Sequence, residues 1–160
     1  MGTLEADSQR WAVRSTVFGS LFGLLVCNAV QAQVIPDGSL NTIVTSPTSD
    51  NFTITNGSAS GSNLFHSFTS FSIPTNGSAV FDLVNTPNVS TIFGRVTGSN
   101  LSNIDGLIKT VNNSNPVSLF LLNPNGIIFG SKARLNVGGS FVAKFGYPFY
   151  RQAIATINQL

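Results

Sequence analysis

The sequence has few of the residues with which enzymes usually carry out acid–base, nucleophilic or metal chemistry. Only 9% of its 160 residues are charged, and it contains one histidine and one cysteine. The lone Cys27 excludes an intramolecular disulfide. A zinc site needs clustered histidine or cysteine ligands, which one residue of each type cannot supply. His66 would share a strand face with Leu64 and Phe68, so we expect it to be buried beside a hydrogen-bond partner.

Charge is also sparse beyond residue 33, where no glutamate occurs. We predict no nucleic-acid partner, because no basic patch interleaved with aromatic residues precedes residue 140. A glycosidase needs two carboxylates that face each other across the scissile bond, but the aspartates here are isolated in sequence. A carbohydrate-active β-helix enzyme is the alternative, and in it Asp82 would meet Arg95 or Lys109. We predict no enzymatic activity and no cofactor. The charged residues of this part of the chain are Arg95, Lys109, Lys132, Arg134, Lys144, Arg151, Asp37, Asp50, Asp82 and Asp105.

The N-terminal segment has the order of parts that is typical of a secretory signal peptide. Basic residues precede the short apolar run 17-VFGSLFGLLV-26, and small residues follow it. We predict cleavage between Ala32 and Gln33. The apolar run is shorter than the roughly 20 residues of an ordinary transmembrane helix. A retained membrane anchor and a lipidated Cys27 are the alternatives.

The remaining chain has a β composition, because runs of β-branched and aromatic residues alternate with turn-forming pairs such as Asn-Gly. Helix-forming residues are scarce before Arg151. Gly and Asn recur where the runs end, and both tolerate the left-handed backbone that the corners of a solenoid require. The expected strands are 52–55, 64–73, 79–84, 91–98, 104–111, 117–122, 127–130 and 135–143.

Composition alone leaves a sandwich, a barrel and a β-helix open. The runs 117–122 and 127–129 are almost continuously apolar, which predicts strands buried on both faces, as in a parallel sheet. The strands contain few charges, and parallel in-register strands would let asparagine side chains stack into amide ladders. These observations favour a β-helix, although no strict repeat period is visible.

Several segments of the sequence resemble those of a known protein family. They include 34-VIPDGSL-40, 63-NLFHSF-68, 92-IFGRVTGSNLSNIDGLIK-109 and 119-LFLLNPNGIIFGSKARLNVGGSFVA-143. Over about residues 34–143 the chain resembles the N-terminal secretion domain of filamentous-haemagglutinin-like exoproteins, which belong to two-partner secretion systems. The resemblance implies an all-β, right-handed parallel β-helix (a solenoid) with an N-terminal cap. It also implies recognition by a dedicated outer-membrane transporter through its periplasmic domains, and a secreted or cell-surface location.

The family has two Asn-Pro motifs that are associated with secretion. The first is present only in weakened form at 85-NTPNV-89, where Thr86 precedes the proline. The second is intact, and from the resemblance it is the predicted secretion motif. A type I turn with no signalling role is the alternative, since Asn, Pro and Gly suit its positions i, i+1 and i+3. The motif consists of Asn123, Pro124, Asn125, Gly126 and Ile127.

The resemblance ends after residue 143. We therefore divide the chain into a signal peptide at 1–32, a secretion domain at 33–143 and a divergent tail at 144–160, with a weakly helical pattern over 151–160. We interpret the tail as the product of a truncated or frame-disrupted gene whose passenger is missing. A short variant with a helical cap and a non-functional remnant are the alternatives. Binding to carbohydrate or a cell surface would belong to the missing passenger.

Overall fold

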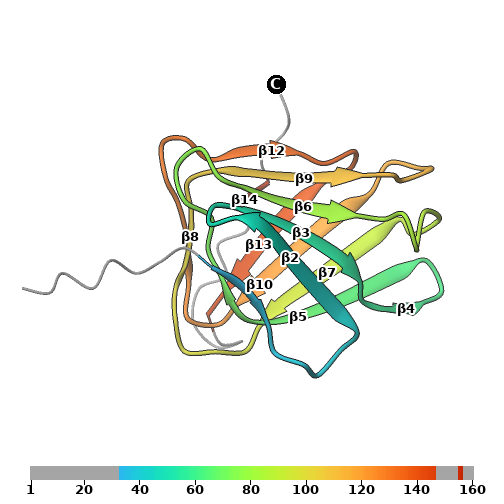
Figure 1. Cartoon of the computed structure of the whole chain (residues 1–160), viewed down its shortest axis with the longest axis horizontal. Helices are drawn as coiled ribbons and strands as arrows, with labels where there is room; N and C mark the ends of the chain where they lie inside the picture. Colours follow the sequence, from blue (N-terminus) through green and yellow to red (C-terminus); the bar gives the residue numbers. More distant parts are fainter. Residues whose placement is uncertain (1–32, 147–154, 157–160) are drawn as a thin grey trace, which may run out of the picture.

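The computed structural model of the chain describes residues 33–146 and 155–156, and within these ranges every regular element is a β-strand. The predicted signal peptide at 1–32 lies outside the described residues. The strands form three sheets (Figure 1). Sheet A contains β1 (Val34–Pro36), β4 (Ser58–Ser60), β5 (Asn63–Phe71), β7 (Thr91–Val96), β10 (Ser118–Asn123), β13 (Phe141–Phe145) and β14 (Ala155–Thr156). Sheet B contains β2 (Thr42–Thr48), β3 (Asn51–Asn56), β6 (Ser78–Asp82), β9 (Leu107–Val111) and β12 (Arg134–Asn136), and sheet C contains β8 (Ser102–Ile104) and β11 (Ile127–Phe129).

The chain winds from sheet A through sheet C to sheet B and back, and so forms a parallel β-solenoid of about three turns. In sheet A, β5, β7, β10 and β13 pair in parallel, and in sheet B β3, β6, β9 and β12 do the same. The predicted β-helix fold is therefore confirmed. Residues paired across β5, β7 and β10 are 28 and then 27 residues apart, but those paired across β10 and β13 are only 22 apart. This shortening explains why the sequence shows no fixed period.

Antiparallel strands cover the N-terminal end of the solenoid. β1 pairs with β5 at the edge of sheet A, and β2 pairs with β3 at the edge of sheet B. β4 folds back on β5 as a hairpin arm. Together β1 and β2 occupy the strand edges that the first coil would otherwise expose for pairing with other chains.

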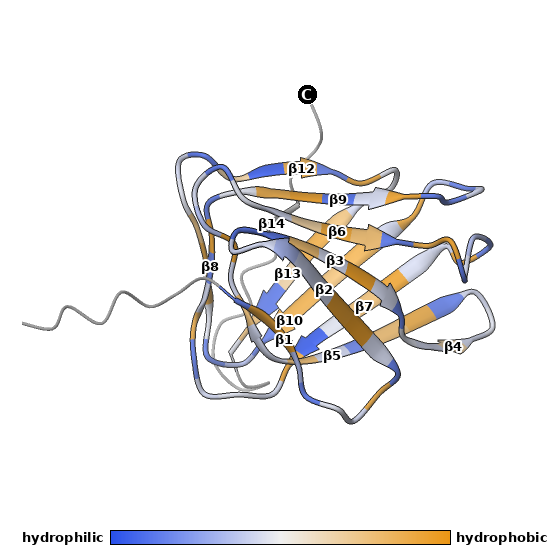
Figure 2. Ribbon diagram, in the orientation of Figure 1, coloured by the Kyte–Doolittle hydropathy of each residue, from blue (hydrophilic) through white to orange (hydrophobic). Residues whose placement is uncertain are grey.

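The core lies inside the solenoid, where buried phenylalanine and aliphatic side chains from all three sheets meet. Apolar residues are concentrated on the strands and hydrophilic residues at the turns (Figure 2). Burial alternates along β10: Leu119 and Leu121 are completely buried, whereas Phe120 and Leu122 face outward and are half-buried. The expectation that 117–122 is buried on both faces is therefore wrong. Of its outward residues, Phe120 stacks on Phe93 of the previous coil, whereas Leu122 lies in register between Arg95 and Lys144.

Two predicted strands are each interrupted by a corner of the solenoid. The segment 104–111 is divided by Asp105 and Gly106 into β8 and β9, and 135–143 is divided at 137–140 into β12 and β13. A side chain at Gly106 would place its Cβ 2.4 Å from the carbonyl oxygen of Gly77, so the chain passes the previous coil closely there. The left-handed residues expected at corners are present, at Asn56, Asn76 and Asn112 and at several glycines.

The described part of the tail is extended rather than helical. Ala155 and Thr156 form β14, which pairs antiparallel with Ala143 and Val142 of β13. The predicted helical pattern is thus wrong for these two residues, and the rest of 147–160 lies outside the described residues. Within the described ranges, no helix is long and apolar enough to cross a membrane.

Candidate functional site

The predicted secretion motif forms a tight corner between β10 in sheet A and β11 in sheet C. The backbone N–H of Gly126 donates to the carbonyl oxygen of Asn123 at 3.1 Å, which closes a four-residue turn. The φ of Asn125 is not positive, and a type I turn requires a negative φ at this third position. Gly126 has a φ of 124°, a conformation that favours glycine. The predicted turn is therefore present.

Asn123 points into the solenoid and is completely buried. Its Nδ2 donates to the carbonyl oxygen of Asn100 at 3.0 Å and to Ser102 Oγ at 2.9 Å, while its Oδ1 accepts from the backbone N–H of Asn125 at 2.9 Å. Both amide hydrogens and the amide oxygen are thus in use. A buried amide that is fully hydrogen-bonded costs little to bury, but loss of its partners is expensive. Asn123 therefore joins the corner to the previous coil.

The other motif residues divide between the surface and the interior. Asn125 is exposed, and its Nδ2 donates to the carbonyl oxygen of Gly98 at 2.7 Å. Pro124 is exposed, and its carbonyl oxygen accepts from Gly146 N at 3.3 Å. Ile127 is buried and belongs to the hydrophobic core. A partner protein could therefore touch the side chains of Pro124 and Asn125, but not those of Asn123 and Ile127.

The weakened motif at 85–89 does not repeat this geometry. It lies at a different corner, between β6 in sheet B and β7 in sheet A. Asn85 is exposed and donates through Nδ2 to Asn56 Oδ1 at 2.7 Å, whereas Val89 is buried in the core. This Asn56–Asn85 contact is one example of the side-chain amide pairing that was expected between coils.

Sequence reasoning did not identify a polar cluster centred on Asp37, in the loop that follows β1. Asp37 Oδ2 accepts from Ser67 Oγ at 2.6 Å and from Thr97 Oγ1 at 2.9 Å. Its Oδ1 accepts from both the backbone N–H and the hydroxyl of Ser39. Arg95 Nε donates to Ser67 Oγ at 2.8 Å, so the loop after β1 shares one hydrogen-bond network with β5 and β7.

The same hydrogen bonds stabilise the charged form of Asp37. Burial alone would raise the pKa of this carboxyl, but the bonds from Ser67, Ser39 and Thr97 together hold it well below its usual range. Asp37 therefore remains an anion throughout the physiological range. Ser67 and Thr97 lie 30 and 60 residues later in the chain than Asp37, so no local sequence pattern predicts this cluster.

His66 is buried as expected, on the inner face of β5. Its Nδ1 lies 3.2 Å from Thr42 Oγ1, and the edge of its ring meets Phe81 with centroids 5.5 Å apart. Burial lowers the pKa of His66 to about 4, so the ring is neutral at physiological pH. This arrangement confirms the expectation of a buried histidine with a hydrogen-bond partner.

The charged groups required by the carbohydrate-active alternative do not pair with each other. Asp82 accepts hydrogen bonds from Asn112 Nδ2 at 2.7 Å and from the N–H of Val84, and not from Arg95 or Lys109. The pKa of Asp105 is lowered by a hydrogen bond from Thr75 and by the backbone N–H of Lys132, so this group links three consecutive coils. Among the described residues, no three potential metal ligands are close enough to hold an ion.

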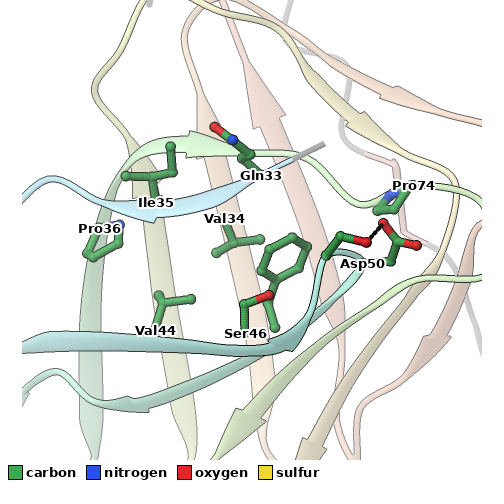
Figure 3. A pocket seen from close by; sticks show the side chains of 10 residues that line it. Gln33, Val34, Ile35, Pro36, Val44, Ser46, Asp50 and Pro74 are labelled. Atoms are coloured by element: carbon green, nitrogen blue, oxygen red, sulfur yellow. Dashed lines mark hydrogen bonds between the residues drawn. The ribbon is translucent and has the colours of Figure 1, made fainter. Parts of the chain in front are cut away.

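The described chain begins beside a surface hollow of about 500 Å³ (Figure 3). Gln33, the residue predicted to follow the cleavage site, is exposed at its edge. Val34, Val44 and Phe52 line its floor between β1 and the β2–β3 pair. Ala32, on the other side of the predicted cleavage site, lies outside the described residues. The hollow contains no cluster of catalytic groups, since Asp50 is its one charged residue.

Comparisons with known proteins agree with this architecture. A search of curated proteins finds no match. Among solved structures, the chain is similar to one described as the crystal structure of filamentous hemagglutinin secretion domain. The two are 21% identical with a TM-score of 0.54, and the match covers 70% of this chain and 41% of that one. This likeness shows the fold, and the chain spans less than half the length of the matched structure. A sequence model described as TPS secretion domain, where TPS stands for two-partner secretion, matches residues 32–144, and the chain therefore belongs to the TPS secretion domain family.

Proposed function

We propose that this domain is the export signal of a haemagglutinin-like exoprotein and that a dedicated outer-membrane transporter recognises it through its periplasmic domains. The family match over residues 32–144 is the observation that carries the proposal. The product would be secreted or displayed at the cell surface. In this proposal, binding to carbohydrate or to a cell surface belongs to a passenger and not to the described residues.

The geometry of the 123–126 corner suggests how its residues share this work. Asn123 is buried, so its contribution to export is to keep the corner folded. Pro124 and Asn125 are exposed, so they are the motif residues whose side chains stay accessible to the transporter once this corner has formed. The predicted secretion motif would therefore combine a structural half with a recognition half.

The solenoid also suggests where the energy for export comes from. Each coil packs only on its neighbours, and stability in such a fold is approximately a sum of contributions from single coils and their interfaces. A chain that emerges from a transporter could thus gain stability coil by coil. This gain would oppose backward movement of the chain without any need for ATP.

The proposal is tested by exporting the full chain through its transporter in vivo and comparing Pro124→Ala with Pro116→Ala. Pro116 is the matched control, because it is also exposed and lies at a neighbouring corner, just before β10. We expect Pro124→Ala to reduce secretion to the level of a strain without the transporter. Replacement of an exposed proline costs about 1 kcal/mol or less, so both variants should remain folded.

Asn123→Ala completes the experiment. It leaves Ser102 and the Asn100 carbonyl without their donor, which should cost about 2–3 kcal/mol of stability, measured by urea unfolding of the purified chain. Its loss of secretion should follow its loss of stability. Equal secretion of the Pro124→Ala and Pro116→Ala variants would contradict a recognition role for the corner.

A further inference from the structure

The outer face of sheet A carries a ladder of phenylalanine rings. Phe65, Phe93 and Phe120 occupy the same register position on β5, β7 and β10. Their rings stack with centroids 5.3 and 5.0 Å apart, and all three residues are half-buried. A row of stacked aromatic rings on the outside of a sheet is not needed to fill the core. It offers an apolar surface to another molecule.

A hollow of about 330 Å³ opens beside this ladder, and Arg95 is its one charged residue. The loop that follows β1 forms one wall, and β5, β7 and β10 form the floor. The lining residues are Leu40, Phe65, His66, Phe93, Arg95 and Leu122. An apolar hollow with one cation at its edge suits an apolar group that carries a carboxylate close by.

The Arg95 guanidinium is held in place by the polar cluster around Asp37. Nε donates to Ser67 Oγ at 2.8 Å, and one terminal nitrogen donates to Ser39 Oγ at 3.1 Å. The Asp37 carboxylate accepts from Ser39, Ser67 and Thr97 rather than from Arg95. A guanidinium has five N–H donors, so Arg95 keeps donors for a ligand while its orientation is fixed in advance.

A second hollow, of about 560 Å³, shares Arg95 and Leu122 with the first and extends to Pro124 and Asn125. Lys144 pairs in register with Leu122, which in turn pairs with Arg95, so this row carries a cation on each side of a leucine. We name the two hollows together the Arg95 groove. It runs from the phenylalanine ladder, across Arg95, to the exposed half of the 123–126 corner.

We propose that the Arg95 groove binds an extended peptide segment of a partner in which an apolar side chain is followed two residues later by Asp or Glu. Phe93 and Arg95 are themselves two residues apart on one face of β7. A strand laid along β7 would therefore place its own alternate side chains over these two positions. The carboxylate would meet Arg95, and the apolar group would enter the hollow beside Phe93. This inference rests on the proposed function only in placing the segment on the transporter.

Binding is tested by fluorescence polarisation of the full chain with a short labelled peptide, Thr-Leu-Thr-Asp-Thr, and its counterpart Thr-Leu-Thr-Lys-Thr. We expect the aspartate peptide to bind and the lysine peptide to bind at least about tenfold more weakly, because a charge-assisted hydrogen bond is replaced by repulsion. Added salt should weaken the aspartate complex, since Arg95 is solvent-exposed.

Four variants keep the test decisive. Arg95→Gln should weaken binding of the aspartate peptide about tenfold. Arg95→Lys should restore only part of the lost affinity. Leu122→Glu replaces no residue of the Asp37 cluster but places a negative charge beside Arg95 in the groove, and it should abolish binding. Lys109→Gln, on the outer face of sheet B, is the matched control and should bind normally. Equal affinity for the two peptides, or full binding by Leu122→Glu, would overturn the proposal.

The same peptide separates this proposal from the export role. Peptide binding that is lost in Leu122→Glu, together with normal secretion of that variant, would uphold the Arg95 groove but overturn its assignment to the transporter. Absence of peptide binding, together with transporter-dependent secretion that fails in Pro124→Ala, would overturn the groove and leave the export role supported.

Discussion

The inner and outer faces of sheet A are built from the same strands and are similarly apolar, yet they do different work. On β10, Leu119, Leu121 and Asn123 point inward and are completely buried. Phe120 and Leu122 alternate with them, point outward and are half-buried. The inner face joins the coils into one core, whereas the outer face presents aromatic and cationic groups to solvent. Apolar character alone therefore does not tell which residues stabilise the fold and which are available to a partner.

The largest expected effect on stability comes from comparing two leucines of β10, one on each face of the sheet. Leu119→Ala removes a fully buried side chain and should lower the free energy of unfolding by about 2–5 kcal/mol. Leu122→Ala should lower it by less than about 1 kcal/mol, because its side chain already lies partly in water. Urea unfolding of both variants measures the difference. Equal losses would show that the outer face also carries the stability of the fold.

An effect of similar size on the free energy of unfolding is expected from His66, the buried imidazole of the inner face. The folded pKa of His66 is about 4 against 6.5 in the unfolded chain, so the unfolded state binds more protons between these values. Above about pH 6.5 this group has no effect on stability. As the pH falls from 6.5 to 4 it should remove about 3 kcal/mol. The lowered pKa values of Asp37 and Asp105 act below this window, because both groups start from 3.8.

The measurement is the unfolding free energy at several pH values for the natural chain and for His66→Gln. Glutamine can still hydrogen-bond with Thr42 but does not titrate, so its curve should be flatter between pH 4 and 6.5. If the unfolding free energies of the two proteins changed with pH in the same way, a group other than His66 would cause the acid sensitivity.

The smallest effect is expected at Gly94, which lies on the inner face beside His66. A Cβ there would lie 3.4 Å from Phe68 Cε2 and 3.5 Å from Leu121 Cδ1, which is ordinary contact. Gly94→Ala should therefore stabilise the fold by about 0.5–1 kcal/mol, measured as a raised urea midpoint. Gly98→Ala is the contrasting variant. Its Cβ would lie 2.2 Å from the carbonyl oxygen of Thr69, so this substitution should destabilise the fold. A lowered midpoint for Gly94→Ala would mean that the inner face has no room even for a methyl group.

Local signals predicted most of the strands and the turn at 123–126, since β-branched runs and Asn-Pro-Asn-Gly act within a few residues. The composition only favoured a parallel β-helix over a sandwich or a barrel, and the family resemblance implied it. The sequence did not separate the two faces of 117–122, because apolar residues stand at inward positions (Leu119, Leu121) and at outward positions (Phe120, Leu122) alike. It also joined β8 to β9 and β12 to β13, because the corners between them are short.

Long-range contacts account for what the sequence could not show of the candidate site. The burial of Asn123 depends on Asn100 and Ser102 in the previous coil, 23 and 21 residues earlier. The Asp37 cluster joins residues up to 60 positions apart. The packing of one coil on another sets these contacts, and it depends on coil lengths that vary from 28 to 22 residues.

The hydrogen bond between Asp37 and Thr97 also has a meaning for the order of folding. Asp37 stands just after β1, but its last side-chain donor, Thr97, comes directly after β7. A chain in which only the first coil has folded can pair β1 with β5 but lacks this donor. The second coil therefore adds a bond to the N-terminal strands as well as its own packing. Truncation before residue 97 should weaken the N-terminal end of the solenoid in addition to shortening it.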